Sequence, residues 1–237
     1  MKLLIKKDFS AGIRAGIPVC LGYFSVSFGF GATAIAKGLS IFQAILISAT
    51  NLTSAGQFAG LTVIVTGGAI LEMIITQIII NSRYSLMSLA LTQKISPTAG
   101  YGKRLCAAFF NTDEVFAIGM AREGKLSTAY FVGAGVISAI GWVSGTATGA
   151  IAGSLLPTAV QLALGALLYG MFIAIVIPQA RQEKPMLACM VLALVISCLF
   201  AWVPGLNAIR PGLAIVFCTV ITAAVCALLF PIKEAAE

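Results

Sequence analysis

The amino-acid sequence predicts an all-α polytopic membrane protein. Of the 237 residues, 59% are hydrophobic and only 10% are charged, and the mean hydropathy is +1.03. A chain of this composition has too little polar surface to cover a water-soluble globule of its size. Residues 126–180 contain no charged side chain. That stretch is long enough to cross the hydrocarbon layer twice, since one crossing takes about 20 residues.

The first apolar segment, residues 15–36, follows Lys2, Lys6 and Lys7, as the apolar core of a secretory signal peptide would. It is longer than the core of such peptides, which is about 7 to 15 residues. We therefore expect that this segment is not cleaved off and forms the first transmembrane helix.

Two later segments are interrupted by small and polar residues. The interruptions are residues 51–57, inside segment 39–71, and residues 111–114, inside segment 105–121. Non-helical backbone at membrane depth is tolerated only where protein or a water-filled cavity satisfies it. We predict about six full transmembrane helices plus two broken or re-entrant segments, in a single domain over residues 1–237, because no linker divides the chain. The apolar segments are 15–36, 39–71, 73–82, 84–93, 105–112, 115–121, 126–180, 185–209 and 211–232.

The lysines and arginines predict the orientation of these helices. If both broken segments re-enter without crossing, twelve basic residues lie on one side and two on the other. The basic side faces the cytoplasm, which places both termini there. If one or both broken segments cross fully, the chain has seven or eight spans. The larger group is Lys2, Lys6, Lys7, Arg14, Lys94, Lys103, Arg104, Arg122, Lys125, Arg181, Lys184 and Lys233, and the smaller is Lys37 and Arg210.

Four ionisable residues stand within the apolar segments or at their breaks: Glu72, Arg83, Asp113 and Glu114. A charge at the bilayer centre costs roughly 2.5 to 3.5 kcal/mol, so such residues usually face a cavity or a partner. On one continuous helix Glu72 and Arg83 would be about 16 Å apart, unless the helix unwinds near residues 81–82. In the alternative interpretation, Arg83 snorkels to a membrane interface and Glu72 lies at one.

Asp113 and Glu114 have both a structural and a functional interpretation. They follow Asn111 and Thr112, a pattern typical of a capped helix start with acidic residues near the positive dipole end. With no histidine in the chain, a carboxylate in a broken helix is also its simplest proton carrier. We predict Asp113, Glu114 and Glu72 as proton-coupling candidates, with Asp113 preferred.

A neutral amino acid zwitterion would need polar groups at membrane depth. In the first break, Ser54, Gly56 and Gln57 offer backbone and amide groups of the kind that bind substrate in several transporter folds. Polar residues Gln77, Asn81, Tyr84 and Ser88 follow one side of the next helix. The predicted substrate-binding residues are Ser54, Gly56, Gln57, Asn81, Arg83 and Tyr84.

Glycines recur at every fourth position in one predicted helix, at Gly141, Gly145, Gly149 and Gly153. They line one helix face with bare backbone, which allows a second helix to approach closely. We expect tight packing there, either inside one bundle or against a second copy or a partner subunit.

The sequence gives no support for an enzyme, a metal protein or a nucleic-acid-binding protein. The six cysteines form no Cys-x-x-Cys pair, so we expect no metal site and interpret them as small buried thiols. The string 119–126 resembles a phosphate-binding loop, but Leu126 replaces the required hydroxyl and no strand precedes it. The net charge of +7 is distributed in short clusters and forms no nucleic-acid-binding face.

Five short strings, in this order and spacing, resemble the AzlC family, the large subunit of bacterial branched-chain amino acid permeases or exporters. The resemblance covers nearly the whole chain, although Ser82 stands where the family pattern has a leucine. The strings are Phe28-Gly29-Phe30-Gly31, Gly38-Leu39-Ser40, Ala55-Gly56-Gln57-Phe58, Asn81-Ser82-Arg83-Tyr84 and Thr112-Asp113-Glu114-Val115-Phe116.

The resemblance implies a secondary transporter in the bacterial cytoplasmic (inner) membrane. It would export leucine, isoleucine and valine with coupling to the proton gradient, without a cofactor, and together with a small AzlD-like membrane subunit. The alternatives are a membrane channel or a permease for another small solute. A channel would show conductance without saturation.

Overall fold

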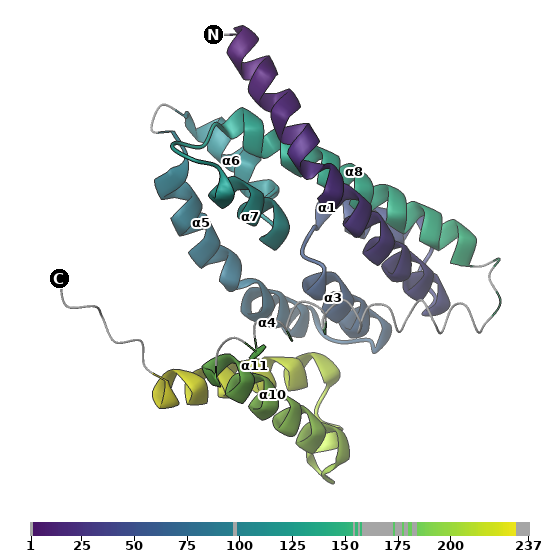
Figure 1. Cartoon of the computed structure of the whole chain (residues 1–237). Helices are drawn as coiled ribbons and strands as arrows, with labels where there is room; N and C mark the ends of the chain where they lie inside the picture. Colours follow the sequence, from purple (N-terminus) through teal and green to yellow (C-terminus); the bar gives the residue numbers. More distant parts are fainter. Residues whose placement is uncertain are drawn as a thin grey trace. The chain divides into compact units, whose positions relative to one another are not determined.

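The computed structural model of the chain describes residues 2–96, 99–153 and 184–230, and residues 155, 157, 173, 177, 180 and 181 between them. The described part is helical, apart from one isolated bridge between Ile95 and Leu126 (Figure 1). The helices are α1 (Lys2–Ala36), α2 (Ile41–Thr50), α3 (Ala55–Val65), α4 (Ile70–Asn81), α5 (Arg83–Lys94), α6 (Tyr101–Phe109), α7 (Asp113–Ala121), α8 (Thr128–Gly153), α10 (Lys184–Trp202), the 3₁₀ turn η1 (Leu206–Ala208) and α11 (Pro211–Leu229).

Four helices in the described ranges are long and apolar enough to cross a membrane: α1, α8, α10 and α11. A fifth span results if α4 and α5, interrupted at Ser82, are counted as one. The predicted class of all-α multi-pass membrane protein is confirmed, whereas the predicted six to eight spans are not. Most of the second crossing expected within residues 126–180 lies outside the described residues.

Both predicted helix breaks are present, and the first has a local cause. The first separates α2 from α3, where Asn51 Oδ1 accepts hydrogen bonds from the backbone nitrogen and the hydroxyl of Thr53 at 2.9 and 2.6 Å. Such a turn competes with helical hydrogen bonding, and the positive φ of Ser54, 48°, also departs from the helix. The second break separates α6 from α7, which begins after the N-cap residue Thr112.

The helices form two compact units, each built from interleaved parts of the chain. Unit 1 contains residues 1–57 and 81–168, and unit 2 contains residues 58–80 and 169–237. The single domain predicted from the sequence is thus divided into two groups of helices, neither of which is one continuous stretch. We describe each unit separately.

Unit 1 is organised by α1 and α8, which lie side by side and run parallel (Figure 1). Along α1, Gly12, Cys20 and Phe28 lie against Tyr130, Gly141 and Gly149 of α8. Residue numbers therefore increase in the same direction along both helices. A Cβ atom at any of these glycines would overlap with a backbone carbonyl of the other helix. The predicted glycine face is therefore covered by α1 itself, including Gly145 against Phe24 and Gly153 against Ala32.

The basic loops of unit 1 meet at the end where α8 begins. Arg122 pairs with Asp8 of α1 at 3.1 Å. Lys94 Nζ donates to the carbonyl of Met120 at 2.8 Å, and Lys125 Nζ donates to the carbonyl of Gln93 at 3.2 Å. Loops that the charge pattern assigns to one membrane side thus lie together.

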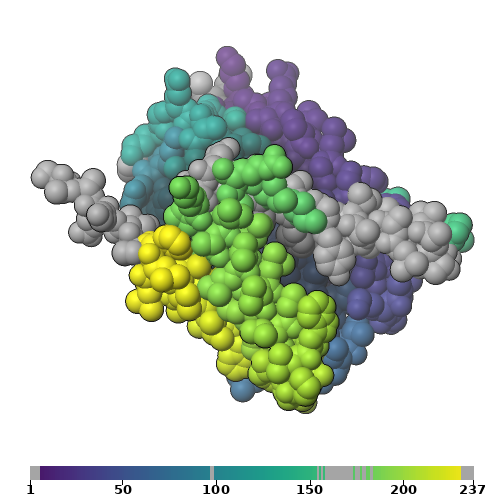
Figure 2. Space-filling view, turned by 60° about the horizontal axis from the view of Figure 1, so that its bottom comes forward, coloured from purple at the N-terminus to yellow at the C-terminus, as the bar shows by residue number. Residues whose placement is uncertain are grey.

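Unit 2 contains most of α3 and α4 together with α10 and α11. Figure 2 shows α10 and α11 side by side. A disulfide joins them between Cys189 and Cys226, and Cys106 and Cys198 are exposed, which corrects the interpretation of all six cysteines as buried thiols. Spacing alone could not reveal the pair, because its members are 37 residues apart.

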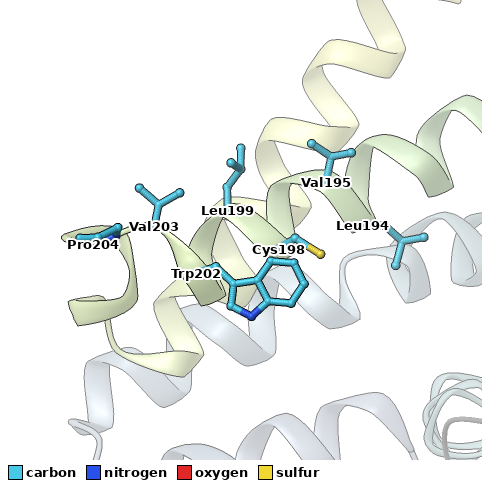
Figure 3. A pocket seen from close by; sticks show the side chains of 7 residues that line it. All are labelled: Leu194, Val195, Cys198, Leu199, Trp202, Val203 and Pro204. Carbon is cyan, nitrogen blue, oxygen red and sulfur yellow. The ribbon is translucent and has the colours of Figure 1, made fainter.

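An apolar groove of about 440 Å³ runs along the surface of α10. Figure 3 shows its side chains, which come from the second half of α10 and the turn that follows. No charged side chain lines it, so it offers nothing to the charges of an amino acid. The lining residues are Leu194, Val195, Cys198, Leu199, Trp202, Val203 and Pro204.

Candidate functional site

The two helix breaks of unit 1 border the same small core. Leu52, from the first break, and Phe110, from the second, both pack against Tyr23 of α1 and Trp142 of α8. Residues about 60 positions apart in the sequence are thereby brought to one place between α1 and α8. The candidate site is built around this core.

An ion pair between α5 and α7 lies at the second break. Arg83 Nη1 contacts Asp113 Oδ2 at 2.5 Å, and both side chains are 45% exposed. Arg83 also donates to Tyr84 Oη at 3.2 Å, and its guanidinium lies 4.9 Å from the centre of the Tyr84 ring. This position follows from the interruption at Ser82, which starts α5 at Arg83. The ion pair and the adjacent Tyr84 thus bring together three residues that the sequence singles out.

Glu114, next to Asp113, has a different environment. Its Oε2 accepts a hydrogen bond at 2.5 Å from Tyr23 Oη of α1. Tyr23 is 8% exposed, and its ring meets Trp142 edge-on with 5.2 Å between ring centres. Glu114 therefore contacts a neutral hydroxyl, whereas Asp113 contacts a cation.

Two polar residues of the second break keep unsatisfied atoms. Asn111 Nδ2 donates to Ser88 Oγ of α5 at 3.1 Å, while Asn111 Oδ1 is buried with no hydrogen-bond partner in the described part of the chain. The same holds, within the described residues, for Thr112 Oγ1, and Thr112 makes no side-chain cap for α7. Helix capping by the Thr112 side chain thus does not account for this break.

At the first break, Gln57 has a different environment. Gln57, 2% exposed, donates from Nε2 to Ser48 Oγ at 2.9 Å and accepts from Trp142 Nε1 at 2.8 Å. Ser48 Oγ is in turn 2.7 Å from Thr146 Oγ1. Both amide atoms of Gln57 are used inside the protein, so this side chain is placed to fasten α3 to α2 and α8.

The other predicted binding residues of the first break are also enclosed. Gly56 is buried, and its backbone nitrogen donates to the carbonyl of Thr53 at 3.3 Å. Ser54 Oγ is buried without a hydrogen-bond partner among the described residues. Asn81, at the end of α4, is half-buried.

Glu72 belongs to unit 2. It lies in the first turn of α4, is 4% exposed, and its Oε2 is 3.4 Å from Nη1 of Arg210. A Cβ atom on Gly68 or Gly212 would lie 2.9 or 2.6 Å from its carboxylate oxygens. Glu72 therefore forms an ion pair with Arg210, while its Oε1 is buried without a hydrogen-bond partner among the described residues.

Sequence reasoning missed four residues of the arrangement. Tyr23, Trp142, Ser48 and Thr146 lie in apolar stretches and belong to no polar run. A tyrosine or tryptophan inside a predicted span is a weak signal, because both rings pack well in apolar cores. Their polar atoms become informative only when the folded partners are known.

The chemistry of the site is that of charge recognition. Arg83 offers a planar cation suited to a carboxylate, and Asp113 and Glu114 offer two acceptors for an ammonium group. Within the described residues, no group of three or more His, Cys, Asp or Glu side chains could hold a metal ion. Parallel glycine-packed helices, broken helices and charges at membrane depth together define a polytopic membrane protein with a polar site between its helices.

Comparison with known proteins names the family. The AzlC protein family profile matches residues 18–156, more than half of the chain, and the chain belongs to this family. It is 28% identical over 194 residues to the inner membrane protein YgaZ of Escherichia coli K12, covering 79% of this chain and 78% of that protein. It is 30% identical over 175 residues to an uncharacterized membrane protein of Archaeoglobus fulgidus, covering 73% and 76%. No solved structure matches the chain.

Proposed function

We propose that the chain is the large subunit of a secondary transporter that exports branched-chain amino acids and uses the proton gradient. The observation that carries the proposal is the half-exposed Arg83–Asp113 pair at a helix break. A zwitterion that leaves water needs both of its charges satisfied. Arg83 can bind its carboxylate in a bidentate way, and the neighbouring carboxylates can accept its ammonium group.

The surroundings of the breaks favour an aliphatic substrate. Leu52 and Phe110 border the two breaks, and both belong to the apolar core around Trp142. A branched aliphatic side chain is stabilised by such neighbours in proportion to the apolar area that it buries. Substrates with a charged side chain would need a further partner.

The energy source follows from what the sequence lacks. The string at residues 119–126 is not a usable nucleotide loop, so a gradient is the simplest source. One elementary charge that moves across the membrane gains about 2.3 kcal/mol per 100 mV. That energy is sufficient to expel the solute against a concentration ratio of roughly fiftyfold.

The proposal also includes location and assembly. The basic loops that meet at one end of unit 1 support an inner-membrane protein with cytoplasmic termini. A small AzlD-like membrane subunit remains part of the proposal on the strength of the family alone. Because α1 covers the glycine face of α8, we expect this subunit to contact another surface.

Efflux from proteoliposomes tests the function directly. Vesicles loaded with labelled leucine, isoleucine or valine are assayed with and without an imposed pH gradient, with and without the small subunit, and with lysine and glutamate as controls. We expect saturable, gradient-driven flux of the three branched-chain amino acids. Conductance without saturation would instead identify a channel, and full flux without the small subunit would remove it as a requirement.

A further inference from the structure

We infer that Glu114 is the group at which a proton and the ammonium group of the transported amino acid replace each other, with Tyr23 as its positioning residue. The inference rests on the proposed function and deepens it. Of the three proton-coupling candidates, it selects Glu114 over Asp113, which the sequence favours, and over Glu72.

The charges around Glu114 do not balance. Arg83 from α5 is in contact with Asp113, the sequence neighbour of Glu114. The other titratable groups facing Glu114 are Tyr23 from α1 and Tyr84 from α5, both neutral phenols, and α8 has no charged residue. When both carboxylates are ionised, the described part of the site carries one excess negative charge. Such a charge is costly at membrane depth.

One positive charge therefore completes the site, and two species can supply it. A proton on Glu114 gives a neutral acid that keeps its hydrogen bond with Tyr23. The ammonium group of a bound zwitterion neutralises the carboxylate instead, while the zwitterion's own carboxylate lies against Arg83. Asp113 is already in contact with a cation, Arg83.

A second observation indicates that a ligand completes this break. Asn111 is 6% exposed, and its Oδ1 lacks a hydrogen-bond partner among the described residues. Buried polar atoms are seldom left unpaired. Asn111 lies three positions before Glu114 at the same helix break, where an ammonium group could donate to this oxygen.

This arrangement couples the two fluxes by mutual exclusion. An entering zwitterion displaces the proton of Glu114 to the compartment that the site then faces. When the zwitterion leaves on the other side, a proton from that side takes its place. Each cycle exchanges one neutral zwitterion for one proton, so one positive charge moves opposite to the substrate.

Binding of labelled leucine to the purified full chain, measured over a series of decreasing pH values, tests the exclusion. In the unmodified protein, the affinity should fall by up to about tenfold per pH unit on the acid side, because the two ligands exclude each other. Glu114→Gln should bind leucine as weakly as the unmodified protein does at low pH, and its affinity should change little with pH. Asp113→Asn should keep the pH slope at lower affinity, and Glu123→Gln, a change at an exposed loop acid, should keep the whole profile. An unchanged slope in Glu114→Gln overturns the inference.

A second measurement needs no substrate. The chain has two tryptophans, so Trp202→Phe leaves Trp142, which contacts Tyr23, as the single reporter. Its emission should change in one step as the pH is lowered and Glu114 takes up a proton. Glu114→Gln should remove the step and Tyr23→Phe should reduce it. The absence of the step in the parent, or its persistence in Glu114→Gln, overturns the proton site.

The two measurements separate the possible failures. If no amino acid binds while the Trp142 step depends on Glu114, the proposed substrate and the ammonium exchange are wrong and the proton site stands. If leucine binds and is transported but neither readout depends on Glu114, the proposed function stands and the inference is wrong.

Discussion

The two helix breaks of unit 1 have similar sequences and opposite environments. Each contains an asparagine and a threonine within an apolar stretch. At the first break, Gln57 is 2% exposed and has both amide atoms bonded inside the protein. At the second, Asp113 and Arg83 are 45% exposed, and Asn111 Oδ1 has no partner in the described residues.

The difference teaches that a polar group at membrane depth is not by itself a binding group. A side chain whose donors and acceptors are all bonded internally stabilises the fold, because breaking those bonds leaves buried atoms unsatisfied. A charged side chain that is partly accessible can exchange its partner for a ligand. We therefore assign a structural role to the first break and a ligand-binding role to the second.

The largest effect is expected at the contact on which both breaks depend. Gly149→Leu places a side chain where the backbone of Phe28 lies, so α1 and α8 must separate and both breaks lose their supports. We expect loss of the monodisperse, folded protein in detergent, measured by size-exclusion chromatography. Gly22→Leu is the matched control, since a Cβ atom there meets nothing within 4 Å. Equal behaviour of the two variants would contradict the described helix packing.

The second break should dominate transport. Arg83→Gln removes the cation that we assign to the substrate carboxylate, and a lost charged hydrogen bond is worth about 1.5–3 kcal/mol. We expect amino acid affinity to fall by roughly tenfold or more, with partial recovery in Arg83→Lys. Counterflow in proteoliposomes at matched protein levels measures this loss. Arg14→Gln, at an exposed position of α1, serves as the control, and a flux in Arg83→Gln equal to that of this control would refute the role.

The first break should instead influence stability. Gln57→Ala leaves Trp142 Nε1 without its acceptor and removes one of the two hydrogen bonds of Ser48 Oγ, at a cost of about 1–3 kcal/mol. We expect a lower unfolding temperature in a thiol-reactive or light-scattering melt, with transport per folded molecule close to normal. Gln93→Ala, at an exposed position, should change neither quantity. Normal stability combined with lost transport would reverse our assignment of the two breaks.

Membrane orientation can be tested by cysteine labelling, without a transport assay. In a chain lacking its six native cysteines, a single cysteine at exposed Glu123 should be shielded from an impermeant thiol reagent added outside intact cells. A cysteine at exposed Lys37 should react. The opposite labelling would place the basic end of unit 1 outside and refute the orientation that the charge pattern predicts.

The sequence by itself determined the class of the protein, its family and the positions of its helix breaks. The apolar composition indicates that lipid surrounds the protein, and the clusters of small and polar residues at 51–57 and 111–114 interrupt helices, so these features are local. The importance of Arg83, Asp113 and Glu114 was also predictable, because a charged side chain in a membrane segment is costly and usually faces a cavity or a partner. The glycine repeat predicted a close contact but could not name the partner helix.

Only the tertiary structure decided which of these groups meet. The pairing of Arg83 with Asp113 and of Tyr23 with Glu114 joins residues 30 and 91 positions apart, and no periodicity relates such positions. The neutral partner of Glu114 and the saturated amide of Gln57 likewise depend on how α1 and α8 pack. Partner choice and exposure are properties of the packed helices, because they depend on distances that the local pattern does not contain.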